Sequence, residues 1–152
     1  MKFKILGFVF LLGFSCLQSF AQLMDGQPAV FTQKDSLRGT LSNFRNCYDV
    51  TYYHLAVKIN IDAKTIQGSN SISFKCLSDF EEIQIDLFEN LNIDQILFQG
   101  KALTFKRVYN AVFVKFPNKL LKGQQEKITV FYSGAPSIAK KAPWDGGIVF
   151  SK

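Results

Sequence analysis

Few residues in this chain of 152 could bind a metal ion or act as a nucleophile. It contains one histidine, His54, and three cysteines, of which Cys47 and Cys76 lie away from the N-terminus. A His-Glu-x-x-His site needs two histidines, and a catalytic zinc generally has three protein ligands. In the strand register derived below, His54 and Cys76 lie on opposite faces. The sequence therefore predicts no metal site, with His54 an exposed strand residue.

Other catalytic arrangements are also absent from the sequence. A Ser–His–acid triad would have to use His54, and no Gly-x-Ser-x-Gly turn is present. The adjacent acids Glu81 and Glu82 are expected at a solvated turn, and Asp86 and Asp94 are expected to point outward from strands. We therefore predict no catalytic residue and no cofactor-binding residue in this chain.

One aromatic residue could serve a binding role. Trp144 precedes Asp145-Gly146-Gly147, and an indole ring offers a flat apolar surface with one hydrogen-bond donor. Such a ring could be a ligand platform. We favour the simpler interpretation, in which Trp144 packs beneath its turn or docks on a missing domain.

The N-terminus has the order of features found in secretory signal peptides. Lys2 and Lys4 are followed by an uncharged apolar stretch over residues 5–17, and Ser19-Phe20-Ala21 places small residues at the cleavage site. We expect cleavage before Gln22 and export to the periplasm or the medium. The stretch is shorter than the roughly 20 residues that span a bilayer, so we expect no stable membrane span after cleavage. A buried core helix is the alternative.

A lipoprotein signal is a variant of the same prediction. Cys16 follows Gly13-Phe14-Ser15, and the bulky Phe14 fits a lipid-attachment pattern poorly. Lipidation at Cys16 is therefore left open.

The remaining composition is that of one exported domain. Removing residues 1–21 from 152 leaves 131 residues, which suits a single domain. Two of the 18 basic residues leave with the signal, so 16 bases oppose 12 acids, a net charge of +4. The longest basic run is Lys140-Lys141, with no basic stripe of the kind that binds nucleic acid. We expect a solvated surface and no nucleic-acid partner.

Two neighbouring segments alternate as the strands of a hairpin. Residues 52–61 alternate with period two, which predicts a half-buried strand; its inward residues would be Tyr53, Leu55, Val57, Ile59 and Ile61. A turn over residues 62–65 leads into a strand over 66–74. The expected pairs are Ile61–Ile66, Leu55–Ile72 and Tyr53–Phe74. Gly68 is expected at a bulge or at a close backbone approach.

This register bears on the two cysteines. It places Cys76 opposite Thr51, four residues from Cys47, which is roughly 13 Å at about 3.3 Å per residue. A disulfide requires Cα atoms within about 7 Å. We therefore expect two separate core thiols, unless the chain bends sharply before Tyr48.

Further strands complete an all-β pattern. Strands are expected over residues 82–87, 91–98, 103–109, 111–116 and 127–132, with a break near Asp94-Gln95 and a loop at 117–119. No window of a dozen residues has a helical period. We predict an antiparallel β-sandwich or a saddle-like bent sheet of about seven or more strands. A new apolar run at 148–150 begins just before the last residue, which we interpret as a truncation.

The order of these motifs resembles a known family. An Arg-x-x-Tyr-Asp-Val strand starts at Arg45, Gly68 lies in the next strand, and Ile72-x-Phe74 follows. This order, over residues 44–150, resembles the opening of the aminopeptidase N family of zinc metallopeptidases. The sequence Pro-Trp-Asp-Gly-Gly at 143–147 is similar to a loop of its secreted bacterial members.

The resemblance implies a domain organisation and a partner. After the predicted signal peptide at 1–21 and an extension at 22–43, it implies an incomplete N-terminal β domain at 44–152 that would lean on a thermolysin-like catalytic domain. The family's enzymes remove N-terminal residues from peptides. Their zinc is held by a His-Glu-x-x-His helix and a later Glu, and a Gly-x-Met-Glu-Asn strand holds the substrate amine.

Neither of those motifs occurs in this chain. The resemblance therefore implies a non-catalytic scaffold whose partner is a missing or separate catalytic domain of the same enzyme, with zinc only in the full-length protein. The chain alone is expected to be inactive. The alternative is a self-sufficient exported β-sandwich that binds a peptide, a glycan or a protein.

Overall fold

The computed structural model describes residues 30–142 and 144–151. The predicted signal segment, its cleavage site and Cys16 lie outside the described residues. The chain divides into two units, residues 1–32 and 33–152. In the first unit the described residues are Val30, Phe31 and Thr32, which are exposed and in no helix or strand. All elements below belong to the second unit.

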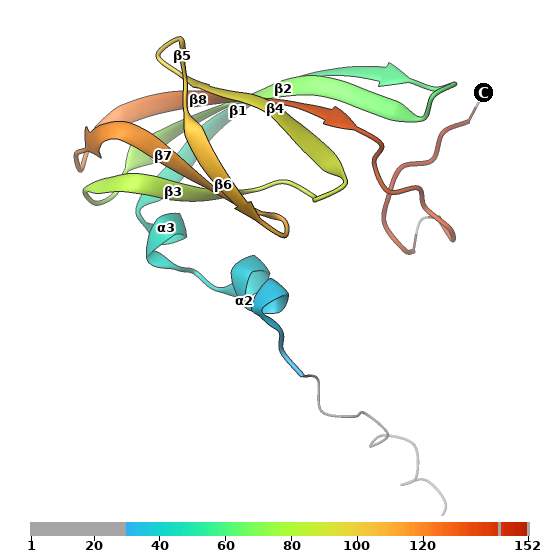
Figure 1. Cartoon of the computed structure of the whole chain (residues 1–152), viewed down its shortest axis with the longest axis horizontal. Coiled ribbons are helices and arrows are strands. Elements are labelled where there is room, and N and C mark those ends of the chain that lie inside the picture. Colours follow the sequence, from blue (N-terminus) through green and yellow to red (C-terminus); the bar gives the residue numbers. More distant parts are fainter. Residues whose placement is uncertain (1–29, 143, 152) are drawn as a thin grey trace, which may run out of the picture. The chain divides into compact units, whose positions relative to one another are not determined.

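The second unit contains two short helices and eight strands among its described residues (Figure 1). They are α2 (Gln33–Gly39), α3 (Asn43–Asn46), β1 (Tyr48–Asn60), β2 (Thr65–Cys76), β3 (Phe80–Asp86), β4 (Leu91–Phe98), β5 (Lys101–Ala102), β6 (Thr104–Val108), β7 (Ala111–Leu120) and β8 (Gln125–Gly134). Neither helix was predicted. With seven and four residues, both are too short to show a helical period.

The strands form two antiparallel sheets, which confirms the predicted all-β class. The larger sheet has the order β1-β2-β8-β4-β5, and the smaller has the order β3-β7-β6. Every strand pair in them is antiparallel. The predicted break in the fourth strand is also present, since the β4–β8 register shifts between Ile93 and Gln95.

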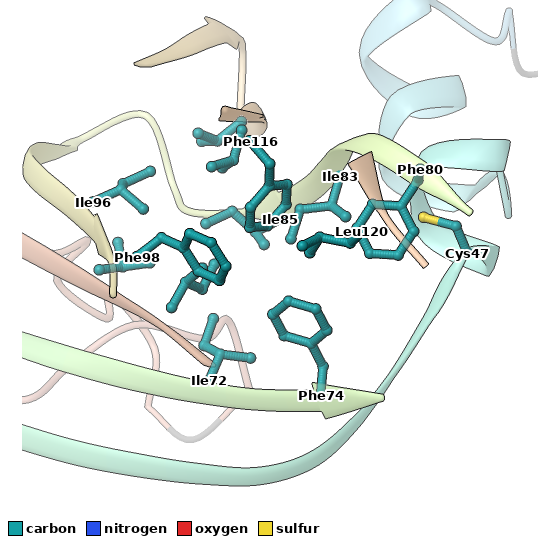
Figure 2. Packing of buried hydrophobic residues seen from close by; sticks show 14 of the residues in the cluster. Cys47, Ile72, Phe74, Phe80, Ile83, Ile85, Ile96, Phe98, Phe116 and Leu120 are labelled. Carbon is teal, nitrogen blue, oxygen red and sulfur yellow. The ribbon is translucent and has the colours of Figure 1, made fainter. Parts of the chain in front are cut away.

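The core lies between the two sheets. Figure 2 shows Ile72 and Phe74 on β2 facing Phe80, Phe116 and Leu120 from the opposite side. Phe74 is fully buried and its ring centroid lies 6.3 Å from that of Phe116. Phe98 and Phe116 pack edge to face at 5.1 Å. In each strand every second side chain points inward, and the inward side chains of the two sheets pack together in one aromatic and aliphatic layer.

The predicted hairpin register is wrong by two residues. Tyr53 pairs with Ile72 rather than Phe74, and Ile59 pairs with Ile66. The turn occupies residues 61–64 instead of 62–65. The side chain of Asn60 closes it, because its Oδ1 accepts a hydrogen bond from the Ala63 N–H at 2.9 Å. A shift of two keeps every side chain on its predicted face.

Gly68 lies at a close backbone approach and not at a bulge. Its pairing with Val57 on one side and Tyr132 on the other is regular. A Cβ at this position would lie 2.3 Å from the Ala56 carbonyl oxygen and 3.1 Å from Tyr132 Oη. The bulge of β1 lies instead between Val50 and Tyr52.

The expected separation of the two cysteines is also wrong. Because of the bulge and the two-residue shift, Cys76 pairs with Tyr48, the residue next to Cys47. The carbonyl of Cys47 accepts a hydrogen bond from the Leu77 N–H at 2.7 Å. Both thiols are nevertheless free and buried, as predicted. Figure 2 shows the Cys47 side chain directed at Phe80.

Two expectations about the later strands need correction. The loop expected at 117–119 is part of β7. Pro117 is tolerated there because the β3–β7 ladder is interrupted between Phe80 and Glu82. Its nitrogen, which carries no hydrogen, therefore does not have to donate a ladder hydrogen bond. The apolar run at 148–150 forms a single parallel bridge, between Ile148 and Ile138, and no strand.

Candidate functional site

The residues considered for chemistry do not converge. Within residues 30–142 and 144–151, no group of three or more histidine, cysteine or acidic side chains is placed to hold a metal ion. His54 is exposed on β1, as predicted. Glu81 and Glu82 lie at the start of β3 and not at a turn.

Asp86 and Asp94 are exposed, as predicted, and each has a structural partner. Asp86 forms an ion pair with Arg45, and Asp94 accepts a hydrogen bond from the Ser133 hydroxyl at 2.8 Å. Gln84, which is buried, donates to the Leu37 carbonyl at 3.0 Å and to Asp86 at 3.2 Å. These contacts join α2 and α3 to β3. We therefore interpret them as contacts that stabilise the fold rather than as parts of a catalytic site.

Burial makes both cysteines poor nucleophiles. The pKa of the Cys47 thiol is raised, chiefly by burial, and the pKa of the Cys76 thiol is raised for the same reason. A thiol in this state is neutral at physiological pH, and the neutral form is unreactive. Burial likewise raises the pKa of the neighbouring Tyr48 hydroxyl to about 12, and this hydroxyl donates to the Gln84 carbonyl at 2.7 Å.

The largest departure from the sequence prediction is an uncovered apolar surface on β1. The apolar residues predicted to point inward are exposed, with fractions between 43% and 61%: Tyr53, Leu55, Val57, Ile59 and Ile61. Four of them, Tyr53, Leu55, Val57 and Ile59, lie within β1 and share the face of Ile72, which is buried in the core. We call these four residues the β1 apolar row.

The uncovered region begins where the smaller sheet ends. Figure 1 shows the β1–β2 hairpin reaching past β3, β6 and β7. A hollow of about 240 Å³ lies at this boundary, lined by Leu55 and Tyr132 from the larger sheet and by Ile85 from the smaller one. Asn70 also lines it, and its buried Oδ1 has no hydrogen-bond partner among the described residues. The surface therefore offers mainly apolar contacts.

Trp144 is a second exposed apolar residue, and the expectation that it packs beneath its turn is wrong. Its exposed fraction is 89%. Beside it, the Asp145 carboxylate accepts hydrogen bonds from the backbone N–H groups of Lys141 at 2.8 Å and Lys140 at 2.5 Å. These bonds lower the pKa of Asp145. The turn is thus held from within, and the indole ring stays free to meet another surface.

Sequence reasoning found the residues of the apolar row but not their exposure. Their alternation showed that one face of β1 is apolar. It gave no sign of how far the second sheet extends over that face.

Neither of the helices in the described part of the chain has the length and apolar character of a membrane-spanning helix.

The sequence matches no family model and no curated protein. The structure is similar to an M1 zinc metallopeptidase from Deinococcus radiodurans bound to a Tyr-Ser-Ala substrate, with a TM-score of 0.57 and 17% identity over 66% of this chain and 24% of that chain. It is also similar to a two-domain M1 zinc metallopeptidase bound to L-arginine, with a TM-score of 0.56 and 18% identity over 66% and 23%. This likeness shows a shared fold. The chain spans about a quarter of the length of these structures.

Proposed function

We propose that this chain is a non-catalytic N-terminal scaffold domain of a secreted zinc aminopeptidase, an enzyme that removes N-terminal residues from peptides. One observation carries the proposal: two thirds of the chain share a fold with M1 zinc metallopeptidases while matching only about a quarter of their length. A domain of that size is a part of such an enzyme and supplies it with a supporting surface.

The sequence supports a scaffold role. A His-Glu-x-x-His zinc site needs two histidines, and the whole chain has one, His54, which is exposed on the face of β1 opposite to the β1 apolar row. The zinc would be held by a catalytic domain of the same enzyme, which is the partner we propose. The N-terminal order of charge, apolar stretch and small residues supports export, to the periplasm or the medium.

The exposure of the β1 apolar row is evidence that the chain contacts a further domain or protein. Contiguous exposed apolar surface on a soluble domain commonly marks a contact with another domain or protein.

Two experiments test the proposal. Sequencing the gene beyond the codon for Lys152 should reveal a His-Glu-x-x-His motif in the same reading frame, and a stop codon followed by unrelated sequence would count against it. The purified chain, assayed with added zinc on aminoacyl substrates, should show no turnover. Clear turnover that follows the chain through purification would contradict the scaffold role.

One observation favours a second candidate function, a self-sufficient binding module. Trp144 is almost fully exposed in a turn held by Asp145, and exposed tryptophans often anchor partners. A sharp thermal transition without binding of an apolar dye would favour the module. Strong dye binding, which Leu55→Lys reduces, would favour the scaffold.

A further inference from the structure

β1 is an open edge of the larger sheet. Of its thirteen residues, all but Thr51 pair with β2 on one side, and among the described residues no strand pairs with the other side. An edge strand presents a row of N–H and C=O groups that can form hydrogen bonds with a further strand. Residues 51–60 are all exposed, so this edge is accessible over most of its length.

The side chains along this edge carry charges as well as apolar groups. Asp49 lies near its start and Lys58 near its end, both exposed, and neither forms an ion pair with any described residue. Both lie on the face opposite to the β1 apolar row, because their partners on β2, Lys75 and Gln67, alternate with the inward residues. A partner that follows the edge therefore meets one acidic and one basic group.

We propose that the β1 edge is a self-association surface, at which a second copy of the chain adds its own β1 in the antiparallel direction. The two larger sheets then continue into one another across a two-fold axis, the commonest symmetry of soluble oligomers. Strand addition of this kind gains main-chain hydrogen bonds along the edge, while alternate side chains set the register. This proposal is independent of the aminopeptidase assignment.

Face matching and charge together select the register. Residues opposite one another must lie on the same face of the joined sheet, so the axis passes through a residue and its own copy. With the axis at His54, Leu55 lies beside Tyr53 of the second copy. Beyond the bulge, which makes Thr51 the extra residue, Val57 lies beside Val50 of the second copy.

In the same register Lys58 lies opposite Asp49 of the second copy, and symmetry repeats this charge pair on the other side of the axis. Moving the axis to Ala56 would place Lys58 opposite His54 of the second copy and leave Asp49 without an opposite charge on the second copy. The register at His54 thus pairs apolar with apolar on one face and acid with base on the other. Opposite charges on facing residues stabilise a strand pair, and like charges destabilise it.

The first test measures the association of the purified chain by sedimentation velocity over a range of concentrations. A concentration-dependent dimer is expected. The variants Asp49→Lys and Lys58→Asp should each weaken it roughly tenfold, because each replaces two attractions by two repulsions. The double variant, which restores opposite charges, should recover the affinity. Lys127→Glu, a reversal on the central strand β8, is the matched control and should leave the dimer unchanged.

A second test fixes the register. His54→Cys places one thiol at the axis, so oxidised glutathione should convert the two thiols of a dimer into one disulfide and be reduced in turn. Lys127→Cys should give no linked dimer, and the buried Cys47 and Cys76 should not react. Circular dichroism checks that each variant is folded.

Three results would overturn the proposal. The first is a monomer at every concentration, which would leave the edge free or reserved for another part of a larger protein. The second is a dimer that neither charge reversal weakens. The third is disordered aggregation that Lys58→Asp does not change.

Discussion

Tyr53 and Ile72 lie directly opposite one another on β1 and β2 and point to the same face of the sheet, yet Ile72 is 7% exposed and Tyr53 is 57% exposed. On this face of the sheet, the side chains therefore change from buried to exposed between two neighbouring strands. The smaller sheet covers Ile72 and stops before Tyr53. This boundary decides which apolar side chains stabilise the domain and which are available for contact.

The boundary predicts opposite effects for two substitutions on the same face. Ile72→Ala should lower the free energy of unfolding by about 2–4 kcal/mol, since it removes buried methyl groups and leaves a cavity. Leu55→Lys should change it by less than about 0.5 kcal/mol, because Leu55 is already exposed. Urea unfolding followed by circular dichroism measures both. An equal loss in the two variants would show that β1 is covered in solution.

The close approach at Gly68 predicts that Gly68→Ala is destabilising. The new methyl group would lie 2.3 Å from the Ala56 carbonyl oxygen, and backbone must move to make room. A loss of about 1–3 kcal/mol is expected, measured by urea unfolding. Gly39→Ala is the control: nothing lies within 4 Å of its Cβ position at the end of α2, and it should be neutral or stabilising. A neutral Gly68→Ala would contradict the described contact between β1 and β2.

The two buried thiols predict a dependence of stability on alkaline pH. Burial raises the pKa values of Cys47 and Cys76 in the folded state above the usual 9.0, so the folded protein retains protons that the unfolded chain releases. The contribution of these thiols to stability is therefore constant below about pH 9 and falls as the pH rises beyond it. Unfolding at several pH values from 7 to 10.5 measures this decline, and Cys47→Ala should make it shallower.

The same burial predicts the reactivity of the thiols. In a chain that starts at Gln22, a thiol reagent at pH 7.5 should react with neither cysteine in the folded protein and with both after unfolding. If neither reacts after unfolding, the two cysteines form a disulfide, and their assignment as free thiols is wrong.

The turn around Asp145 predicts a response to acid. Hydrogen bonds from Lys141 and Lys140 lower the pKa of this carboxyl, so the bonded turn is favoured at neutral pH. It should loosen as the pH falls below the usual carboxyl range and through the lowered pKa. Trp144 is the single tryptophan of the chain, and its fluorescence should change over that range. Asp145→Asn, which has no charge to titrate, should abolish this change. A titration that persists in this variant would assign the transition to another group.

The sequence determined which residues share a face. Period-two alternation in β1, β2, β3 and β8 follows from the pleat of a strand, and it is local information. The β4 break near Asp94 was also visible, because the apolar parity changes there. The composition alone also excluded a zinc site with two histidines, because the chain contains one histidine.

Tertiary structure decided what covers each face and where each strand pairs. The hairpin register depended on the Asn60 turn and the Thr51 bulge, each of which shifts pairing without changing the alternation. Whether Tyr53, Leu55 or Val57 is buried depends on the extent of the sheet β3-β7-β6, formed by residues more than twenty positions away. The sequence of a strand shows that one of its faces is apolar. It does not show whether that face is covered, because burial requires a second surface, which is formed by other residues of the chain.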